Sequence, residues 1–250
     1  MARSIPLDQL PVFSRENYPE PDFDFAQGAV FLVNKPKGWS SFGVVKRLRK
    51  VLNIRKVGHA GTLDPLATGL LVLCAGRATK SIEQIQELPK TYLADITFGA
   101  STFSYDGETE VNERAEYEQI TENRIDEVME AEFSGEIEQI PPMYSAVKHQ
   151  GKPLYKKARK GETVERKPRM VSIYSHKILR YQPPVLSIEI KCSKGTYIRS
   201  LADDLGKALQ SRAYMSGLKR TAIGHFPFTD AYSIDNLNNL FTTHGEAELS

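Results

Sequence analysis

The pattern of apolar and polar positions predicts several short helices of amphipathic character. In residues 42–52 the apolar side chains fall at i, i+1, i+4, i+7 and i+8, which forms one stripe of a helix. Lysines and arginines occupy the other face of this segment. Helical spacing also predicts helices at 119–133 and 197–209, and shorter ones at about 78–86, 153–159 and 233–240.

Other segments have the period of strands. Residues 70–75 form a continuous apolar run, LLVLCA, typical of a strand that is buried on both faces. Strict alternation over 92–99 and 185–193 predicts half-buried strands, and further strands are expected at 29–33, 171–181 and 214–224. Strands and helices follow each other without regular βαβ alternation. We therefore expect an α+β fold with a mixed, largely antiparallel central sheet flanked by helices.

Composition narrows the class of protein. The chain has 250 residues, of which 40% are hydrophobic and 26% charged, as in ordinary globular proteins. No apolar run approaches the roughly 20 residues that span a membrane, and the first 25 residues lack the apolar core of a signal peptide. We expect these residues to form a loosely ordered arm.

Cys74 and Cys192 lie in apolar or alternating runs, which favours buried, reduced thiols and a cytoplasmic location. Motifs for zinc, dinucleotides and nucleoside triphosphates are missing, so no metal or cofactor is expected.

The net charge of +2 conceals strong segregation of charge along the chain. Residues 35–56 contain eight Lys/Arg and no acids, and residues 148–169 contain nine basic and two acidic residues. Between them, residues 106–138 contain thirteen acids and two arginines. Each run alone is equally well explained as a solvated helix face. Two basic runs with turn signals and small residues favour a nucleic-acid partner instead.

One carboxylate stands out in the stretch 58-GHAGTLDPLATG-69. Asp64 is followed by a proline and surrounded by small residues, a pattern that in most proteins means only a turn. Here the small residues also allow a ligand or another backbone to come close. A carboxylate that meets a polyanion needs cations nearby, and the basic helix directly precedes this loop.

At this point the sequence resembles a known family. The segments 33-VNKPKGWSS-41, 57-VGHAGTLDPLATGLLVLCAGRATK-80, 90-KTY-92, 143-MYSAVKHQGKPLYKKARKG-161, 195-GTYIRSLADDLG-206 and 218-LKRT-221 look like the motifs of the TruB-type tRNA pseudouridine synthases. They occur in order over roughly residues 30–225. The resemblance implies the pseudouridine synthase fold and an isomerase that converts uridine 55 in the TΨC loop of tRNA to pseudouridine. It also implies base flipping, cleavage of the glycosidic bond with the help of an Asp, and re-attachment at C5, without a cofactor.

The resemblance also suggests a domain organisation, with one departure from the family pattern. Typical members carry a small RNA-binding PUA domain at the C terminus, and only about 25 residues follow Gly224 here. We expect an N-terminal arm over 1–26 and a catalytic domain over 27–230 with an acidic and basic insert at about 104–168. A short tail over 231–250, without a full PUA domain, would complete the chain.

The resemblance assigns three catalytic residues. Asp64 matches the catalytic carboxylate, and whether it attacks the ribose, attacks the base or assists a glycal intermediate stays open. Arg199 matches the arginine that pairs with this Asp and keeps it ionised; the alternative is an ordinary residue of a first helical turn. Tyr92 matches the tyrosine that stacks on the flipped base, although its strand position also suits a cross-strand aromatic contact.

Five further residues are assigned to substrate binding in the same way. His59 matches a histidine that fills the space of flipped nucleotides; the alternative is a surface or satisfied loop histidine. Tyr197 matches an aromatic that packs under the base, and an ordinary core tyrosine at a helix start is the alternative. Leu218 matches an apolar residue of the pocket. Lys35 would support the Asp64 loop or contact a phosphate, and a solvated lysine is the competing interpretation. Lys148 and the basic cluster 152–160 would follow RNA phosphates, with 149–155 as a mobile clamp.

Two other functions remain as alternatives. Charge segregation alone also suits a non-catalytic RNA-binding module, but such a module needs no carboxylate facing a polyanion. A hydrolase with one acidic residue is weakly supported, because such enzymes normally need a second carboxylate or a metal. We expect tRNA as the partner and a monomer, since no segment predicts an isologous apolar interface.

Overall fold

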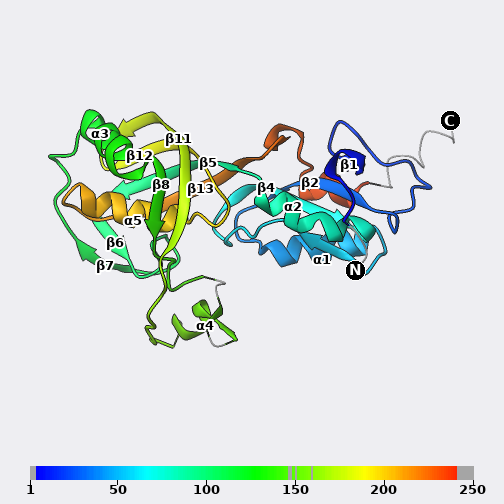
Figure 1. Cartoon of the computed structure of the whole chain (residues 1–250), viewed down its shortest axis with the longest axis horizontal. Helices are drawn as coiled ribbons and strands as arrows, with labels where there is room; N and C mark the ends of the chain where they lie inside the picture. Colours follow the sequence, from blue (N-terminus) through cyan, green and yellow to red (C-terminus); the bar gives the residue numbers. More distant parts are fainter. Residues whose placement is uncertain (1–3, 146–147, 150, 159, 241–250) are drawn as a thin grey trace. The chain divides into compact units, whose positions relative to one another are not determined.

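The computed structural model describes residues 4–145, 148–149, 151–158 and 160–240 (Figure 1). The chain divides into two units. Unit 1 comprises the residues up to Thr91 and those from Lys219 onward, and unit 2 comprises Tyr92–Leu218. Both boundaries fall within strands, because β5 (Lys90–Phe98) and β13 (Ala213–Ile223) each contribute residues to both units.

Unit 1 is built on a mixed sheet. Its own strands are β1 (Val12–Phe13), β2 (Ala29–Lys35), β3 (Val57–His59), β4 (Thr68–Ala75) and β14 (Phe226–Pro227). Strand β2 runs antiparallel to β4, in a register that pairs Ala29 with Ala75 and Lys35 with Gly69. Strand β3 is also antiparallel to β4, whereas the last residues of β13 run parallel to it.

Helices cover both faces of the unit 1 sheet. They are η1 (Leu7–Gln9), α1 (Ser41–Val51), η2 (Gly76–Ser81), α2 (Ile82–Glu87), η3 (Phe228–Asp230) and α6 (Ile234–Asn238). From β2, Phe31 packs in a cluster with Leu48 of α1, while Leu32 packs in another cluster with Ile85 of α2. Because both faces are buried, β2 and β4 are apolar at nearly every position rather than at every second one.

The N-terminal segment is anchored in unit 1, so the expectation of a loosely ordered arm is wrong for residues 4–26. Strand β1 pairs in parallel with β2. The rings of Phe13, Phe25 and Phe31 lie together, with centroids 5.5 to 6.3 Å apart. Single aromatic residues in a polar segment can pack into a core although the segment has no continuous apolar run.

Unit 2 contains the second part of the fold. Its further strands are β6 (Ala100–Thr102), β7 (Val111–Arg114), β8 (Gly135–Gln139), β9 (Lys148–His149), β10 (Lys152–Pro153), β11 (Arg169–Gln182) and β12 (Val185–Cys192). Its helices are α3 (Glu122–Phe133), α4 (Leu154–Ala158) and α5 (Ile198–Ala208). The main sheet has the order β13-β5-β12-β11-β8, with β11 antiparallel to both of its neighbours.

One face of this sheet carries the core of unit 2. From β12 the residues Leu186, Ile188, Ile190 and Cys192 are fully buried and pack with apolar residues of α3 and α5. The residues between them are polar and lie on the other face. This alternation is what the sequence pattern predicted for 185–193.

The predicted fold class is confirmed: the sheet is mixed, largely antiparallel and flanked by helices. The strongly periodic elements lie where the pattern placed them, and both cysteines are buried. The pattern missed β8, which has five residues, and the shorter strands β1, β3, β6, β7, β9, β10 and β14, which have two to four residues each. Within the described ranges no helix is long and apolar enough to span a membrane. The last ten residues of the predicted C-terminal tail, 241–250, lie outside the described residues.

Replacing Gly69 by alanine should destabilise unit 1 strongly. Gly69 has φ +99°, and a Cβ atom there would lie 2.3 Å from the Arg220 carbonyl oxygen. We expect a loss of at least about 3 kcal/mol in the free energy of unfolding, from backbone strain and steric overlap together. Gly38 also has positive φ, +85°, but no atom within 4 Å of such a Cβ. Gly38→Ala should therefore cost only about 1–2 kcal/mol. Equal losses in urea denaturation would contradict the steric argument.

Candidate active site

Asp64 lies in the loop that joins β3 to β4 in unit 1, and it is half-buried. Its backbone carbonyl accepts a hydrogen bond from the Ala67 amide at 3.1 Å, which closes a tight turn. The preceding residue, Leu63, is held at both backbone groups by the buried Ser41 hydroxyl, at 2.9 and 3.1 Å. The start of α1 thus fixes the backbone on one side of the carboxylate.

Lys35 fixes the other side of the same loop. Its side chain is completely buried, which rules out a solvated lysine. The Nζ atom donates to the carbonyl oxygens of Pro36, Trp39 and Pro65, at 3.0, 2.7 and 3.3 Å. Burial lowers the pKa of Lys35 from 10.5 to about 8, an effect that the charge of Asp64 opposes and that of Arg220 reinforces. Lys35 therefore ties the residue that follows Asp64 to the loop after β2.

A second buried cation, Arg220, was not singled out by the sequence analysis. Only 1% of its surface is exposed, and it donates to the carbonyl oxygens of Leu70 at 2.8 Å and Gly61 at 3.1 Å. These two acceptors lie on either side of Asp64 in the sequence. The signal was present in the segment LKRT, but nothing in that string distinguishes a buried arginine from an exposed one.

His59 ends β3 and is half-buried in unit 1. Burial of the ring, and then the nearby Arg220 guanidinium, lower the pKa of His59 below its ordinary value. The imidazole is therefore neutral near pH 7. A neutral ring suits a residue that occupies space or stacks better than one that binds phosphate.

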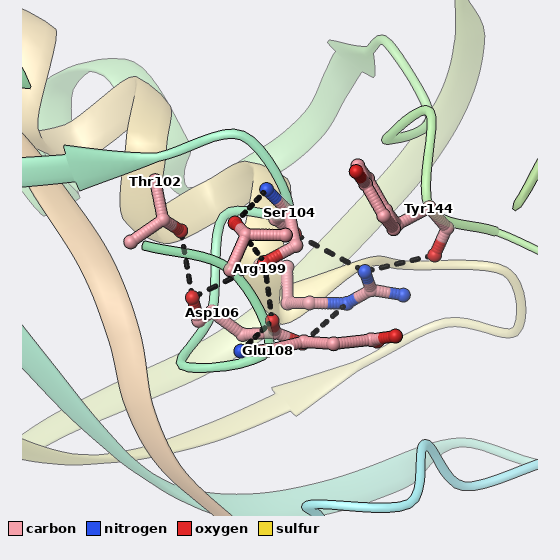
Figure 2. A network of polar contacts seen from close by, with 7 residues as sticks. Thr102, Ser104, Asp106, Glu108, Tyr144 and Arg199 are labelled. Atoms are coloured by element: carbon pink, nitrogen blue, oxygen red, sulfur yellow. Dashed lines mark hydrogen bonds and ion pairs between the residues drawn. The ribbon is translucent and has the colours of Figure 1, made fainter. Parts of the chain in front are cut away.

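Arg199 is the centre of a polar network in unit 2, shown in Figure 2. It belongs to the first turn of α5, and 2% of its surface is exposed. Its Nη1 donates to the carbonyl oxygens of Ser104 at 3.2 Å and Tyr144 at 2.9 Å. Its Nε lies 3.7 Å from a carboxylate oxygen of Asp106. The guanidinium is thus held in one orientation by several acceptors.

Asp106 is a functional candidate that the sequence analysis missed. It is 2% exposed, and one of its carboxylate oxygens accepts hydrogen bonds from the Ser104 hydroxyl at 2.6 Å and the Glu108 amide at 2.9 Å. These contacts shape the turn that carries the Ser104 carbonyl to Arg199. Asp106 is one of thirteen acids between residues 106 and 138, so the charge pattern hid the one that is buried beside a cation.

The remaining predicted residues of unit 2 fall into two groups. Tyr197 is half-buried directly before α5, with its ring centroid 5.9 Å from the Arg199 guanidinium carbon. Tyr92 in β5 and Leu218 in β13 are half-buried and pack at the edge of the hydrophobic core of unit 2. Lys148 belongs to β9, but its side chain lies outside the described part of the chain.

The predicted site residues therefore form two structural groups. Lys35, His59 and Asp64 belong to unit 1, whereas Tyr92, Tyr197, Arg199 and Leu218 belong to unit 2. Within residues 4–240, apart from the gaps in the described ranges, no group of three or more His, Cys, Asp or Glu residues is arranged to hold a metal ion.

Family models cover most of the chain. The model of the TruB family pseudouridylate synthase, N-terminal domain, matches residues 49–198. The chain belongs to the TruB family. The model of the tRNA pseudouridylate synthase B C-terminal domain matches residues 199–249. The resemblance that the sequence motifs indicated is thereby confirmed.

Curated relatives agree with this assignment. The chain is 46% identical to a tRNA pseudouridine synthase B of Francisella philomiragia, over 84% of this chain and 70% of the relative. It is 48% identical to that of Bacteroides fragilis, over 80% of this chain and 88% of the relative. This TruB chain is thus a tRNA pseudouridine synthase, an RNA-binding isomerase.

Solved structures show the same fold. A Cbf5-Nop10-Gar1 complex matches with a TM-score of 0.69 and 29% identity, over 95% of this chain and 60% of that chain. An H/ACA RNP bound to a substrate RNA containing 2'-deoxyuridine matches with a TM-score of 0.65 and 27% identity, over 91% and 57%. The TruB chain spans somewhat more than half the length of these structures. The predicted pseudouridine synthase fold is confirmed.

The stability of this TruB chain should rise between pH 7 and 10 relative to a Lys35→Met variant. The folded-state pKa of Lys35 is lowered to about 8 against 10.5 for the free group, so the unfolded chain binds more protons in this interval. The difference in free energy of unfolding should change by at most about 1.4 kcal/mol per pH unit. Chemical denaturation of wild type and Lys35→Met at several pH values measures this difference in the free energy of unfolding. Lys37 is exposed in the same loop, and Lys37→Met should show no such trend.

Asp106→Asn should lower the rate of pseudouridine formation by about ten- to hundredfold, the range expected when the ion-pair partner of a buried cation is lost. The amide can still accept from Ser104 and Glu108, so the fold should persist while the charge near Arg199 is removed. Glu113→Gln breaks an exposed ion pair with Arg212 and should change the rate less than twofold. Single-turnover kinetics would contradict the role of Asp106 if both variants kept the wild-type rate.

Proposed function

We propose that this TruB chain converts uridine 55 in the TΨC loop of tRNA to pseudouridine, with Asp64 as the catalytic carboxylate. One observation carries the proposal: Asp64 lies in a loop whose backbone is held on both sides by the buried cations Lys35 and Arg220. A turn that served only to connect two strands would not need two buried charges, since each costs several kcal/mol to desolvate.

The reaction is an isomerisation. The bond between N1 of uracil and C1′ of ribose breaks, the base turns, and C5 forms a new bond to C1′. The proton leaves C5 and N1 gains one, so no redox partner and no second substrate is required. Asp64 would assist the cleavage, either as a nucleophile or through a glycal intermediate. The target base must first leave the RNA stack, which costs a few kcal/mol.

The residues of unit 1 present the carboxylate. Lys35 positions the Asp64 loop through the Pro65 carbonyl and, at about pH 8 and below, adds a positive charge near the carboxylate. His59, neutral and half-buried, would fill the space that the flipped nucleotides leave in the RNA loop.

The family resemblance assigns further roles to residues of unit 2. Arg199 would supply the charge that keeps Asp64 ionised when RNA excludes water from the pocket. Tyr92 would stack on the flipped base and remove the C5 proton. Tyr197 would pack under the base, and Leu218 would line the pocket. The network around Arg199 supports this assignment, because two carbonyl oxygens and the nearby Asp106 carboxylate fix the buried guanidinium in one orientation.

The RNA would lie along the basic segments. In and near α1, Lys37, Lys46 and Lys50 are exposed, and Phe42 is 52% exposed with the Lys46 ammonium 5.1 Å from its ring centre. Cations that follow the backbone and aromatic rings that accept bases are typical of RNA surfaces. Lys148 and the basic residues of β9 to α4 would form the clamp over the bound loop, and a monomer would suffice.

Asp64→Asn should abolish pseudouridine formation, by more than about a thousandfold, while tRNA affinity changes less than about threefold. The substitution keeps the shape of the side chain and removes its charge and nucleophilicity. The experiment incubates unmodified tRNA transcript with the protein, maps pseudouridine by carbodiimide primer extension, and measures affinity by filter binding. Wild type should give a single stop at uridine 55.

A variant transcript with cytidine at position 55 provides the control and should give no stop. Stops at other uridines would contradict the proposed specificity. Full activity of Asp64→Asn would contradict the catalytic assignment, and tight binding without any product would favour the RNA-binding module.

A further inference from the structure

The backbone of Tyr197 marks the start of helix α5 in unit 2. It is the N-cap residue of α5, two residues before Arg199, and its own side chain makes no capping hydrogen bond. The first backbone groups of a helix lack partners within the helix and are usually satisfied by a capping side chain. Another part of the chain must therefore fix Tyr197 if its ring and Arg199 are to keep their positions.

Gln139, the last residue of β8, satisfies this requirement. Its side-chain amide binds both backbone groups of Tyr197: Oε1 accepts from the Tyr197 amide at 2.7 Å, and Nε2 donates to the Tyr197 carbonyl at 3.0 Å. Gln139 is 1% exposed, so water cannot replace these bonds easily. The next residue of the chain, Ile140, accepts a hydrogen bond from the Ser200 hydroxyl at 2.8 Å. The end of β8 thus holds the first turn of α5 at two residues.

Arg169 holds the ring of the same tyrosine. Its guanidinium carbon lies 4.5 Å from the centre of the Tyr197 ring, within the range of a cation–π contact. Arg169 begins β11 and is the direct cross-strand partner of Gln139. These two cross-strand neighbours therefore hold Tyr197 together: Gln139 binds its backbone, and Arg169 contacts its ring.

Two of the Arg169 nitrogen atoms point to the same role for its side chain. Its Nε and Nη2 atoms are buried and have no hydrogen-bond partner among the described residues. Leaving two donors of a guanidinium unpaired is unfavourable, so the contacts that the group does make must compensate. An arginine that served only to pair with a carboxylate or a carbonyl would not leave these donors unused.

We infer that Gln139 and Arg169 form a clamp that positions Tyr197 and Arg199 for the isomerisation. Neither residue is catalytic, since each acts through Tyr197. The inference rests on the proposed function, because it assumes that Tyr197 packs under the flipped base. A planar guanidinium is required at 169, since lysine keeps the charge but cannot stack on the ring in the same way.

A double-mutant cycle tests whether Arg169 acts through Tyr197. In the wild-type background, Arg169→Lys should lower the single-turnover rate at saturating enzyme by about three- to tenfold, the range expected for a partly desolvated cation–π contact. The tRNA affinity should stay within about twofold. In a Tyr197→Leu background the same substitution should have no further effect on the residual rate, because the ring that it supports is absent.

Arg180 supplies the matched control. It is exposed on the same strand, β11, and Arg180→Lys should leave the rate unchanged in both backgrounds. Hydrogen exchange of the amides of residues 197–200 gives a second readout that needs no residual rate. Exchange should accelerate in Gln139→Leu and in Arg169→Lys, but not in Arg180→Lys.

Three outcomes would overturn the clamp. Equal losses of rate in the two backgrounds would show that Arg169 acts independently of Tyr197. A loss confined to affinity would show that its free N–H groups bind a phosphate of the RNA. Unchanged rate and exchange would show that the stacking is incidental. If wild type forms no pseudouridine, or Asp64→Asn remains active, the proposed function fails instead, so the two failures can be told apart.

Discussion

The structure of unit 1 depends on the burial of two cations inside a small domain. Lys35 and Arg220 are both almost completely excluded from solvent, and both are bonded to main-chain carbonyl oxygens on either side of Asp64. Unpaired buried charge is strongly destabilising, so the loop must bring its carbonyl groups to the cations in one arrangement. The backbone position of Asp64 follows from the arrangement of the carbonyl groups of Gly61, Pro65 and Leu70 around the two cations.

The same constraint explains why a glycine stands near the start of β4, directly after the Asp64 loop. Strand β4 pairs in parallel with β13 at Gly69, where the backbone of Arg220 leaves no room for a Cβ atom. Gly69 is the cross-strand partner of Lys35 in β2 and also of Arg220 in β13. The two buried cations therefore lie on the strands that flank β4 at this glycine. The packing around Arg220 therefore requires a glycine at position 69.

Much of the fold could be predicted from the sequence because its main elements have strong periods. The stripe of α1, the continuous apolar run of β4 and the alternation of β12 each have one structural interpretation. The anchoring of Phe13 and Phe25 could not be predicted, because isolated aromatic residues in a polar segment carry no period. For the candidate site the resemblance supplied Asp64, Tyr92 and Arg199. Their supports Arg220, Asp106 and Gln139 are ordinary residues whose importance lies in burial and partners, which one sequence does not record.

In both units, buried cations are held by hydrogen bonds to main-chain carbonyl oxygens. Lys35 and Arg220 in unit 1 and Arg199 in unit 2 are each fixed by at least two main-chain carbonyl oxygens. A carbonyl dipole orients a cation and offsets part of its desolvation without cancelling its formal charge, whereas a carboxylate would neutralise it. The carbonyl groups therefore orient all three cations, and at Arg199 the buried Asp106 carboxylate, 3.7 Å from Nε, adds an ion pair. Backbone geometry, together with ion pairing, therefore positions the charges in both units.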